Sequence, residues 1–129
     1  MTRSDLNTYA VSMNAKNQAF QDDFISVAGI QFEQAEGHRE ANLSQATQII
    51  AAHSGHDIYV LPELSSSGYG TRAFERLAEL AEPVDGPSYQ AFSALAGKEG
   101  CYICYSFPKR VANKGYVISA SVVDPRGRL

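Results

Sequence analysis

The amino-acid sequence predicts an α/β domain in which helices pack as a layer against a β-sheet. Short apolar runs rich in β-branched residues alternate along the chain with stretches whose apolar residues recur at helical spacing. Turns that contain Gly or Pro separate most of these segments. The chain has 129 residues, of which 44% are hydrophobic, so it can form one domain with a buried core.

The first part of this pattern predicts a strand, a helix and a second strand. An apolar run from Phe24 to Phe32 predicts the first strand. Residues Glu40 to His53 predict a helix, which a Ser-Gly pair ends. The apolar face of this helix consists of Leu43, Ala46, Ile49 and Ile50. The run from Ile58 to Leu61 predicts the second strand, which stops at a proline because proline cannot donate to a sheet.

Two helices follow in the middle of the chain. A short amphipathic helix ends before Pro83 and carries on its apolar face Phe74, Leu77, Ala78 and Ala81. Ser88 follows a proline and is predicted to cap the next helix. The residues of this second helix that face inward are Phe92, Leu95 and Ala96.

Two strands close the chain, at Tyr102 to Phe107 and at Tyr116 to Val123, and Asp124 to Gly127 form the turn after them. Cys101 and Cys104 form a Cys-x-x-Cys pair at the first of these strands. Because side chains alternate along a strand, the two sulfurs point to opposite faces of the sheet. This argues against a redox or metal pair and favours ordinary strand cysteines.

Composition and charge exclude several classes of function. The net charge is −3, and acidic and basic residues are interspersed without a basic stripe, so nucleic acid is not an expected partner. No run is long enough for a membrane helix, and the N-terminus lacks the apolar block of a signal peptide. Residues 1–23 are polar and are predicted to form an extension before a domain at 24–129. A cytoplasmic location is therefore the default expectation.

Other candidate sites are weak. His53 and His56 are three residues apart but have no third ligand, and His38 stands alone, so no metal site is predicted. Ser65 to Ser67 do not form the Gly-x-Ser-x-Gly elbow of a serine hydrolase. Gly68 to Gly70 are too short for a dinucleotide loop.

Glu63 is the candidate catalytic residue. It comes directly after the predicted buried strand and its terminating proline, and ligands in α/β sheets bind beyond the carboxyl ends of the strands. By residue type alone, an acid at such a position is more often a solvated loop residue. Tyr69, a few residues on, can either line a pocket beside Glu63 or support the turn.

The string from Leu61 to Tyr69, Leu-Pro-Glu-Leu-Ser-x-x-Gly-Tyr, resembles the glutamate motif of the nitrilase superfamily, the carbon–nitrogen hydrolases. The resemblance extends from about Phe24 to Leu129. Ile25 to Gln31 resembles the first strand of that family, and Asn42 falls early in the helix after it. Further landmarks in the order and spacing of the family are Val84 to Ser88, Leu95 to Ala96 and Val123 to Gly127.

The resemblance implies a fold and a mechanism. The fold is an α-β-β-α layered sandwich, of which this chain holds the N-terminal half and lacks the second half. The mechanism cleaves amide, nitrile or carbamoyl bonds with a Glu, a Lys and a Cys: a thiolate attacks the carbon, the Glu moves protons and the Lys stabilises the oxyanion. The residue-by-residue match makes Glu63 the general base. The resemblance implies no metal or organic cofactor. It does imply that the protein forms homo-oligomers.

The lysine and cysteine of that mechanism are expected beyond Leu129. None of the lysines of the chain lies in the lysine motif of the family, and neither cysteine lies at the strand-to-helix elbow of its nucleophile. Three positions also depart from the family pattern: Ser106 replaces a common Gly, Lys109 a common Glu and Ile118 a common Asn. The chain by itself is therefore expected not to turn over substrate.

Two functions remain open at this point. The first is the N-terminal portion of a hydrolase that acts on small amides, nitriles or carbamoyl compounds. The second is a non-catalytic binding or assembly module derived from the same fold, which docks on a relative or on itself through surfaces that half of a layered domain leaves uncovered.

Overall fold

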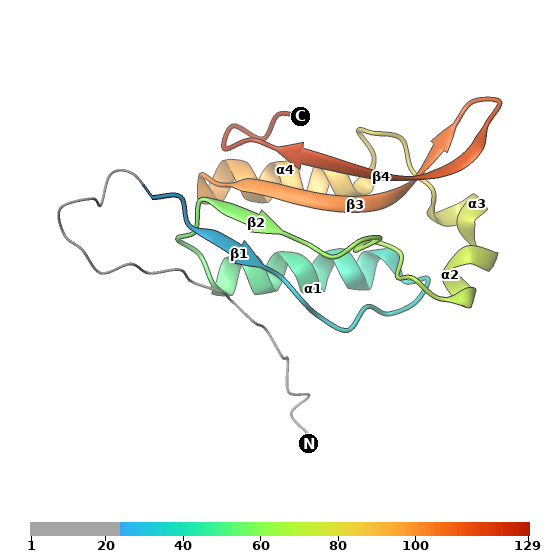
Figure 1. Cartoon of the computed structure of the whole chain (residues 1–129), viewed down its shortest axis with the longest axis horizontal. Helices are drawn as coiled ribbons and strands as arrows, with labels where there is room; N and C mark the ends of the chain where they lie inside the picture. The colour runs from blue at the N-terminus through green and yellow to red at the C-terminus, as the bar shows by residue number, and fades with distance from the viewer. Residues whose placement is uncertain (1–23) are drawn as a thin grey trace, which may run out of the picture.

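A computed structural model describes residues 24–129 of the chain (Figure 1). The predicted polar extension at residues 1–23 lies outside the described residues. The elements are, in chain order, β1 (Val27–Gly29), α1 (Arg39–Ala52), β2 (Ile58–Val60), α2 (Thr71–Glu75), α3 (Leu77–Leu80), α4 (Pro87–Glu99), β3 (Tyr102–Val111) and β4 (Gly115–Val123).

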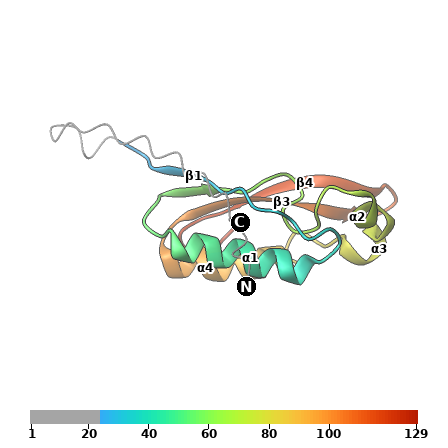
Figure 2. The same cartoon turned by 90° about the horizontal axis from the view of Figure 1, so that it is seen from below.

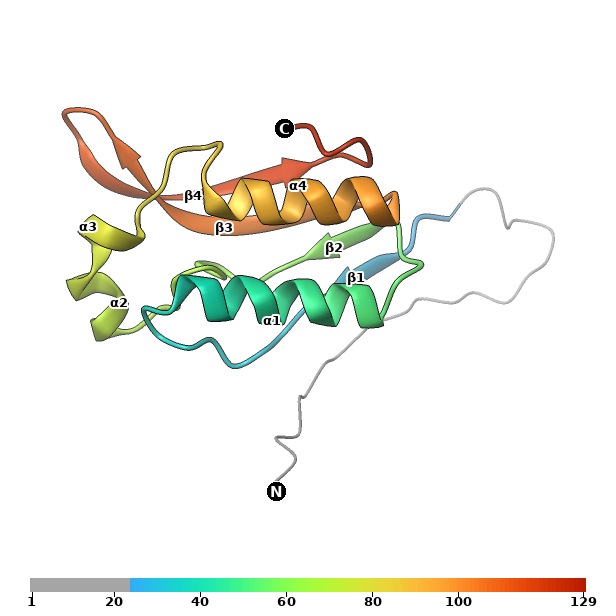
Figure 3. The ribbon, with the colours of Figure 1, turned by 180° about the vertical axis from the view of Figure 1, so that it is seen from behind.

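The strands form one four-stranded sheet in the order β1-β2-β3-β4 (Figure 1). β1, β2 and β3 are parallel, and β4 returns antiparallel to β3 through a hairpin. The parallel strands need crossover connections, which α1 and α4 supply. Both helices lie side by side on one face of the sheet (Figure 3). The predicted α/β layered fold is confirmed.

The core lies between the sheet and the two long helices. Tyr59 and Ile103 point from β2 and β3 toward the helices and are fully buried, as are Ile50 of α1 and Phe92 of α4. The Phe92 ring packs on the Tyr105 ring with 4.8 Å between centroids. Full burial of one such side chain contributes about 1.5–3 kcal/mol, so this layer supplies most of the stabilisation of the described fold.

The opposite face of the sheet carries no helix (Figure 2). Strand residues that alternate with the core residues point to this face, and several large apolar ones are exposed. They come from all four strands and are Val27, Val60, Tyr102, Ile118 and Val122. We call this surface the open sheet face. Among residues 24–129, nothing covers it.

Two predicted elements differ from the structure. The first strand is limited to Val27–Gly29, rather than Phe24 to Phe32, and both Phe24 and Ile25 are exposed. The reason is that β1 pairs only with β2, over three residue pairs. The single helix predicted before Pro83 is instead two short helices that meet at Arg76.

The apolar face predicted for that helix was also wrong. Phe74 and Ala78 are exposed, whereas Ala73 and Leu80 are buried. Because α2 and α3 lie at the end of the sheet rather than on its face, helical spacing in the sequence did not show which side chains are covered (Figure 1).

Ser88 does not cap α4, contrary to the prediction. The capping position belongs to Gly86, and a proline occupies the first turn, where its missing N–H costs nothing. The Ser88 backbone N–H instead donates to Glu82 Oε2 at 3.2 Å. The carboxylate of Glu82 therefore satisfies the start of the helix.

The last predicted turn is confirmed. Gly127 N–H donates to the Asp124 carbonyl at 2.8 Å, and Gly127 has φ +75°, which favours glycine. The Asp124 carboxylate accepts from Arg128, which lowers the pKa of Asp124 to about 2. No helix within residues 24–129 is both long enough and apolar enough to cross a membrane.

Candidate functional site

Glu63 lies where the chain leaves β2 and turns sharply. The turn is closed by the N–H groups of Ser67 and Gly68, which both donate to the Leu64 carbonyl, at 3.1 and 2.9 Å. Leu64 has φ +50°, a conformation that costs energy for a branched residue. Its side chain is only 2% exposed, so packing holds the backbone in this conformation. The turn thus holds the backbone next to Glu63 in one conformation and leaves the Glu63 side chain exposed.

The serines after Glu63 anchor this turn to two other parts of the fold. Ser65 Oγ donates to the Ser106 carbonyl of β3 at 3.1 Å. The Ser66 carbonyl accepts from Asn42 Nδ2 of α1 at 3.0 Å. The Ser67 carbonyl accepts from the Gly37 N–H at 2.8 Å. All three serines are buried, and their anchoring role was missed by sequence reasoning, which tested them only as nucleophiles.

Asn42 is the main link between this turn and α1. It is 0% exposed, as its early position in the helix allows. Its Oδ1 accepts from the Ala35 N–H at 2.7 Å, and its Nδ2 donates to the Ala35 carbonyl at 2.9 Å as well as to Ser66. One amide therefore joins the segment after β1, the start of α1 and the turn that carries Glu63.

A pocket of about 380 Å³ opens beside Glu63 on the open sheet face. Its walls come from the end of β2 and from the middle of β3 and β4, and consist of Leu61, Glu63, Cys104, Tyr105, Ser106, Ile118, Ser119 and Ala120. Two of the three positions that depart from the family pattern, Ser106 and Ile118, line this pocket, whereas Lys109 does not. The lining of the pocket therefore differs from the expected family pattern at these two positions.

Tyr69 does not line the pocket. Its ring packs edge-on against Phe74, with 5.7 Å between centroids, and it is 59% exposed. Of the two alternatives left open by the sequence, the structure favours support of the turn.

The two cysteines lie on opposite faces of the sheet, as their spacing predicts. Cys101 is buried against the helices, and burial raises the pKa of its thiol. Cys104 is partly exposed in the Glu63 pocket. Both thiols are free. Neither lies at the N-terminus of a helix, where a nucleophilic thiol is activated.

The histidines hold structural positions. His53 Nδ1 lies 2.9 Å from the Ile49 carbonyl at the end of α1, and the His56 ring packs edge-on against Tyr59. His38 is the residue before the first turn of α1. In the part of the chain that the structure describes, no three His, Cys, Asp or Glu side chains form a group that could hold a metal ion.

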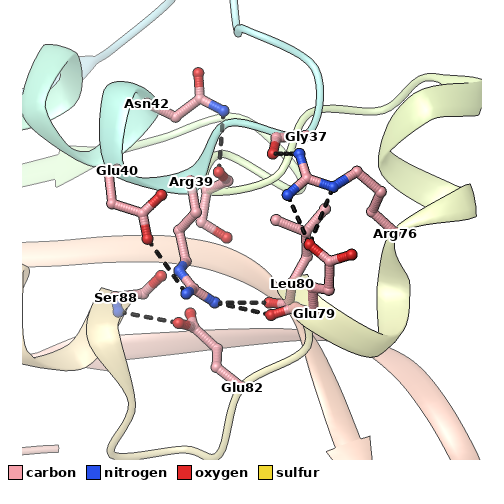
Figure 4. Close-up of polar contacts among 10 residues, drawn as sticks. Gly37, Arg39, Glu40, Asn42, Arg76, Glu79, Leu80, Glu82 and Ser88 are labelled. Carbon is pink, nitrogen blue, oxygen red and sulfur yellow. Dashed lines mark hydrogen bonds and ion pairs between the residues drawn. The ribbon is translucent and has the colours of Figure 1, made fainter.

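A buried acid, Glu82, lies away from the pocket, beside Arg39 (Figure 4). Glu82 is only 2% exposed, and its Oε1 has no hydrogen-bond partner among the described residues. Arg39 Nη1 donates to the carbonyls of Glu79 and Leu80 at 3.4 and 3.3 Å. Desolvation by burial raises the pKa of Glu82, against the opposing effects of the Ser88 hydrogen bonds and the Arg39 charge.

Replacement of Glu82 by Gln is expected to remove a pH dependence of stability. Because the folded-state pKa lies above the usual 4.5, the folded chain binds more protons than the unfolded chain between these two values. The contribution of Glu82 is therefore full below about 4.5 and is lost as the pH rises through the folded pKa. Urea unfolding from pH 4 to pH 8 should show that Glu82→Gln gains stability relative to the wild type as pH rises.

The matched control for this prediction is Glu75→Gln, which changes an exposed acid on α2. Its stability should follow that of the wild type at every pH. A constant difference between Glu82→Gln and the wild type across the whole range would contradict the assignment.

Comparison with known proteins identifies the class to which this fold and site belong. The family described as Carbon-nitrogen hydrolase matches residues 26–129. The chain therefore belongs to the carbon–nitrogen hydrolase family of the nitrilase superfamily, and the predicted resemblance is confirmed.

Two relatives and one solved structure show how similar this chain is to individual proteins. Hydrolase C26A3.11 of Schizosaccharomyces pombe is 33% identical over 130 residues, which are 99% of this chain and 38% of the relative. Omega-amidase NIT2 of Danio rerio is 38% identical over 91 residues, 68% of this chain and 31% of the relative. The crystal structure of Saccharomyces cerevisiae Nit3, a member of branch 10 of the nitrilase superfamily, has a TM-score of 0.71 and 25% identity, over 81% of this chain and 41% of that one.

The chain thus spans about a third of the length of the curated relatives it matches. It has one sheet and one helical layer, and the Glu63 turn lies at the end of β2.

Proposed function

We propose that this chain is the N-terminal portion of a hydrolase that cleaves non-peptide carbon–nitrogen bonds in small amides, nitriles or carbamoyl compounds, with Glu63 as its general base. The observation that carries the proposal is the position of Glu63. Its turn is fixed to β3, to α1 and to the segment before α1, and its carboxylate borders a pocket at the carboxyl end of β2.

In this proposal Glu63 moves protons. It takes the proton of an attacking thiol, passes it to the leaving nitrogen and later activates a water molecule. The attacking thiol and the lysine that stabilises the oxyanion belong to the part of the relatives that this chain does not match. No lysine lines the described pocket, and Cys104 lies within a strand. We therefore expect no turnover by the 129-residue chain alone.

A cytoplasmic location, where thiols stay reduced, suits its two free cysteines.

A chimera tests this function. The matching segment of Omega-amidase NIT2 of Danio rerio would be replaced by the corresponding residues of this chain. Ammonia release from small amides should persist in the chimera and should depend on Glu63. A chimera that folds with native-like circular dichroism, but hydrolyses none of the amides or nitriles offered, would contradict the proposal.

The open sheet face favours a second candidate function, assembly with another copy of the chain. Exposed apolar side chains from four strands lie on one surface, which is unusual for a monomer. At tens of micromolar the chain is expected to sediment above its monomer mass of 14.0 kDa and to bind a hydrophobic dye.

Val122→Lys, which places a charge on the open sheet face, should restore the monomer. Val117→Lys, on the opposite face of β4, should not. A wild-type monomer that binds no dye would count against assembly and leave the hydrolase proposal in place.

A further inference from the structure

Ser106 of β3 extends past the end of β2. Among residues 24–129, the last backbone bond between the two strands runs from the Leu61 N–H to the Cys104 carbonyl, at 2.9 Å. Because the backbone groups of a strand alternate between its two neighbours, Ser106, two residues after Cys104, directs its N–H and carbonyl to the same side. The strand that would meet them has ended, since the chain leaves the sheet at Pro62. Ser106 is only 8% exposed, so these two groups need partners within the protein.

The Ser65 hydroxyl supplies both partners. Its oxygen donates to the Ser106 carbonyl at 3.1 Å and accepts from the Ser106 N–H at 3.4 Å. A hydroxyl can form both bonds because it carries one donor and two acceptor lone pairs. Ser65 is 1% exposed, so solvent has no ready access to these bonds. One side chain therefore takes the place of the next peptide group of β2.

The same two bonds hold the turn that carries Glu63 against the β3 wall of the pocket. Ser65 is two residues after Glu63, and between them Leu64 is held at φ +50°. Glu63 and Ser106 both line the pocket. From the segment before α1, Gln34 Nε2 donates to the carbonyls of Glu63 and Leu64, at 3.4 Å each. The backbone that carries the Glu63 side chain is thus restrained by two separate segments.

We propose that Ser65 is a positioning residue for Glu63: its hydroxyl replaces the missing strand beside Ser106 and so sets the place of the general base in the pocket. This inference rests on the proposed function and adds a residue through which the base acts. Ser65 does not line the pocket itself, so its effect passes through Glu63. A general base must keep its oxygen within hydrogen-bond reach of the proton that it takes, so a shift of the turn lowers its efficiency.

Ser66 provides a matched control within the same turn. It is also 1% exposed, but its hydroxyl has no hydrogen-bond partner among residues 24–129. Ser65→Ala and Ser66→Ala therefore remove the same atom from equally buried positions, and only Ser65→Ala removes bonds to β3. The backbone bond from Asn42 to the Ser66 carbonyl is available in both variants.

Two NMR measurements on the 129-residue chain test this role without any turnover. Ser65→Ala should speed hydrogen exchange of the Ser106 N–H by at least about tenfold, because that group loses its acceptor. It should also lower the backbone order parameter of Glu63 from about 0.85 toward about 0.6. Ser66→Ala should leave both quantities at their wild-type values. No change in Ser65→Ala, or equal changes in the two variants, would overturn the proposal.

A double-mutant cycle in the chimera with Omega-amidase NIT2 tests whether Ser65 acts through Glu63. Ser65→Ala should lower kcat by about 10- to 100-fold, as expected when a catalytic group is displaced, and should change KM by less than about twofold. In the Glu63→Gln background the same substitution should lower kcat by less than about twofold, because the group that it positions has gone. Ser66→Ala should stay within about twofold of its parent in either background.

Equal losses from Ser65→Ala in both backgrounds would show that Ser65 only maintains the fold, and would overturn the proposal. Ser65→Thr keeps the hydroxyl and should recover most of the lost kcat; no recovery would also overturn it. Urea unfolding of every variant ensures that folded proteins are compared. Failure of the proposed function looks different: a folded chimera that hydrolyses nothing, together with the NMR changes in Ser65→Ala, would reject the hydrolase and retain Ser65 as the residue that holds the Glu63 turn.

Discussion

Replacement of Glu63 by Gln in the chimera with Omega-amidase NIT2 is expected to lower kcat/KM for amide hydrolysis by a factor of about 10² to 10⁴. Gln keeps the size and hydrogen-bonding oxygen of the side chain but cannot accept the proton of the attacking thiol. Since Glu63 is exposed and its turn is held by Leu64 and the serines, the substitution should leave the fold unchanged.

The readouts for this prediction are steady-state ammonia release and a thermal unfolding curve for each variant. Glu75→Gln is the matched control, because it removes an exposed acid of the same kind on α2. It should retain the rate of the unmodified chimera. Hydrolysis by Glu63→Gln at that same rate would show that Glu63 is a solvated loop acid and would remove it from the mechanism.

The position of Glu63 could be predicted because it depends on local sequence. An apolar run with β-branched residues and a proline that cannot continue the sheet define the end of a strand, and the acid directly after them lies at its carboxyl edge. The opposite orientations of Cys101 and Cys104 were equally predictable, since alternation along a strand requires no knowledge of its neighbours.

The anchors of the Glu63 turn were not predictable in the same way. Ser65 contacts Ser106, 41 residues away, and Ser66 contacts Asn42, 24 residues away. Serine is common in exposed turns, so nothing local shows that these side chains are buried. Such contacts become visible only once the sheet order is known.

Glu82 illustrates the same difficulty for a charged residue. Its position before Pro83 is typical of an exposed loop, yet it is almost completely buried. The structure explains this, because its carboxylate accepts the Ser88 N–H at the start of α4 while its backbone pairs with β3 at Pro108. The prediction that Ser88 is the cap failed because the acceptor came from a residue outside the helix.

The site and the open sheet face are part of one surface. Ile118 belongs to both, and the exposed apolar side chains of Val60 and Val122 lie on the same face of the sheet. A partner that covers the face would also enclose the pocket and, by excluding water, strengthen the electrostatic interactions of Glu63. The proposed assembly would therefore alter the proposed site, and the Val122→Lys and Glu63→Gln variants test the two proposals separately.

Replacement of Asn42 by Leu is expected to be the most destabilising of the substitutions discussed, by about 3 kcal/mol or more. It removes three hydrogen bonds and leaves the Ala35 N–H and the Ser66 carbonyl without partners, whereas the Ala35 carbonyl still accepts from the His38 N–H, and each unsatisfied buried group costs about 1–3 kcal/mol. The loss corresponds to a fall in Tm of more than about 12 °C for a domain of this size.

Urea and thermal unfolding of the chain measure this loss. Gln48→Leu is the control, because Gln48 is an exposed residue of the same helix that bonds only to Ser44 Oγ, at 2.9 Å, and its replacement should change stability by less than about 0.5 kcal/mol. Asn42→Asp keeps the acceptor for Ala35 but loses both donated bonds, so its stability should fall between those of Asn42→Leu and the wild type. In the chimera, Asn42→Leu should also lower kcat at temperatures where the protein stays folded, since Ser66 no longer holds the turn that carries Glu63. An Asn42→Leu chain as stable as Gln48→Leu would mean that the packing of Leu64 and Ser65 alone fixes that turn.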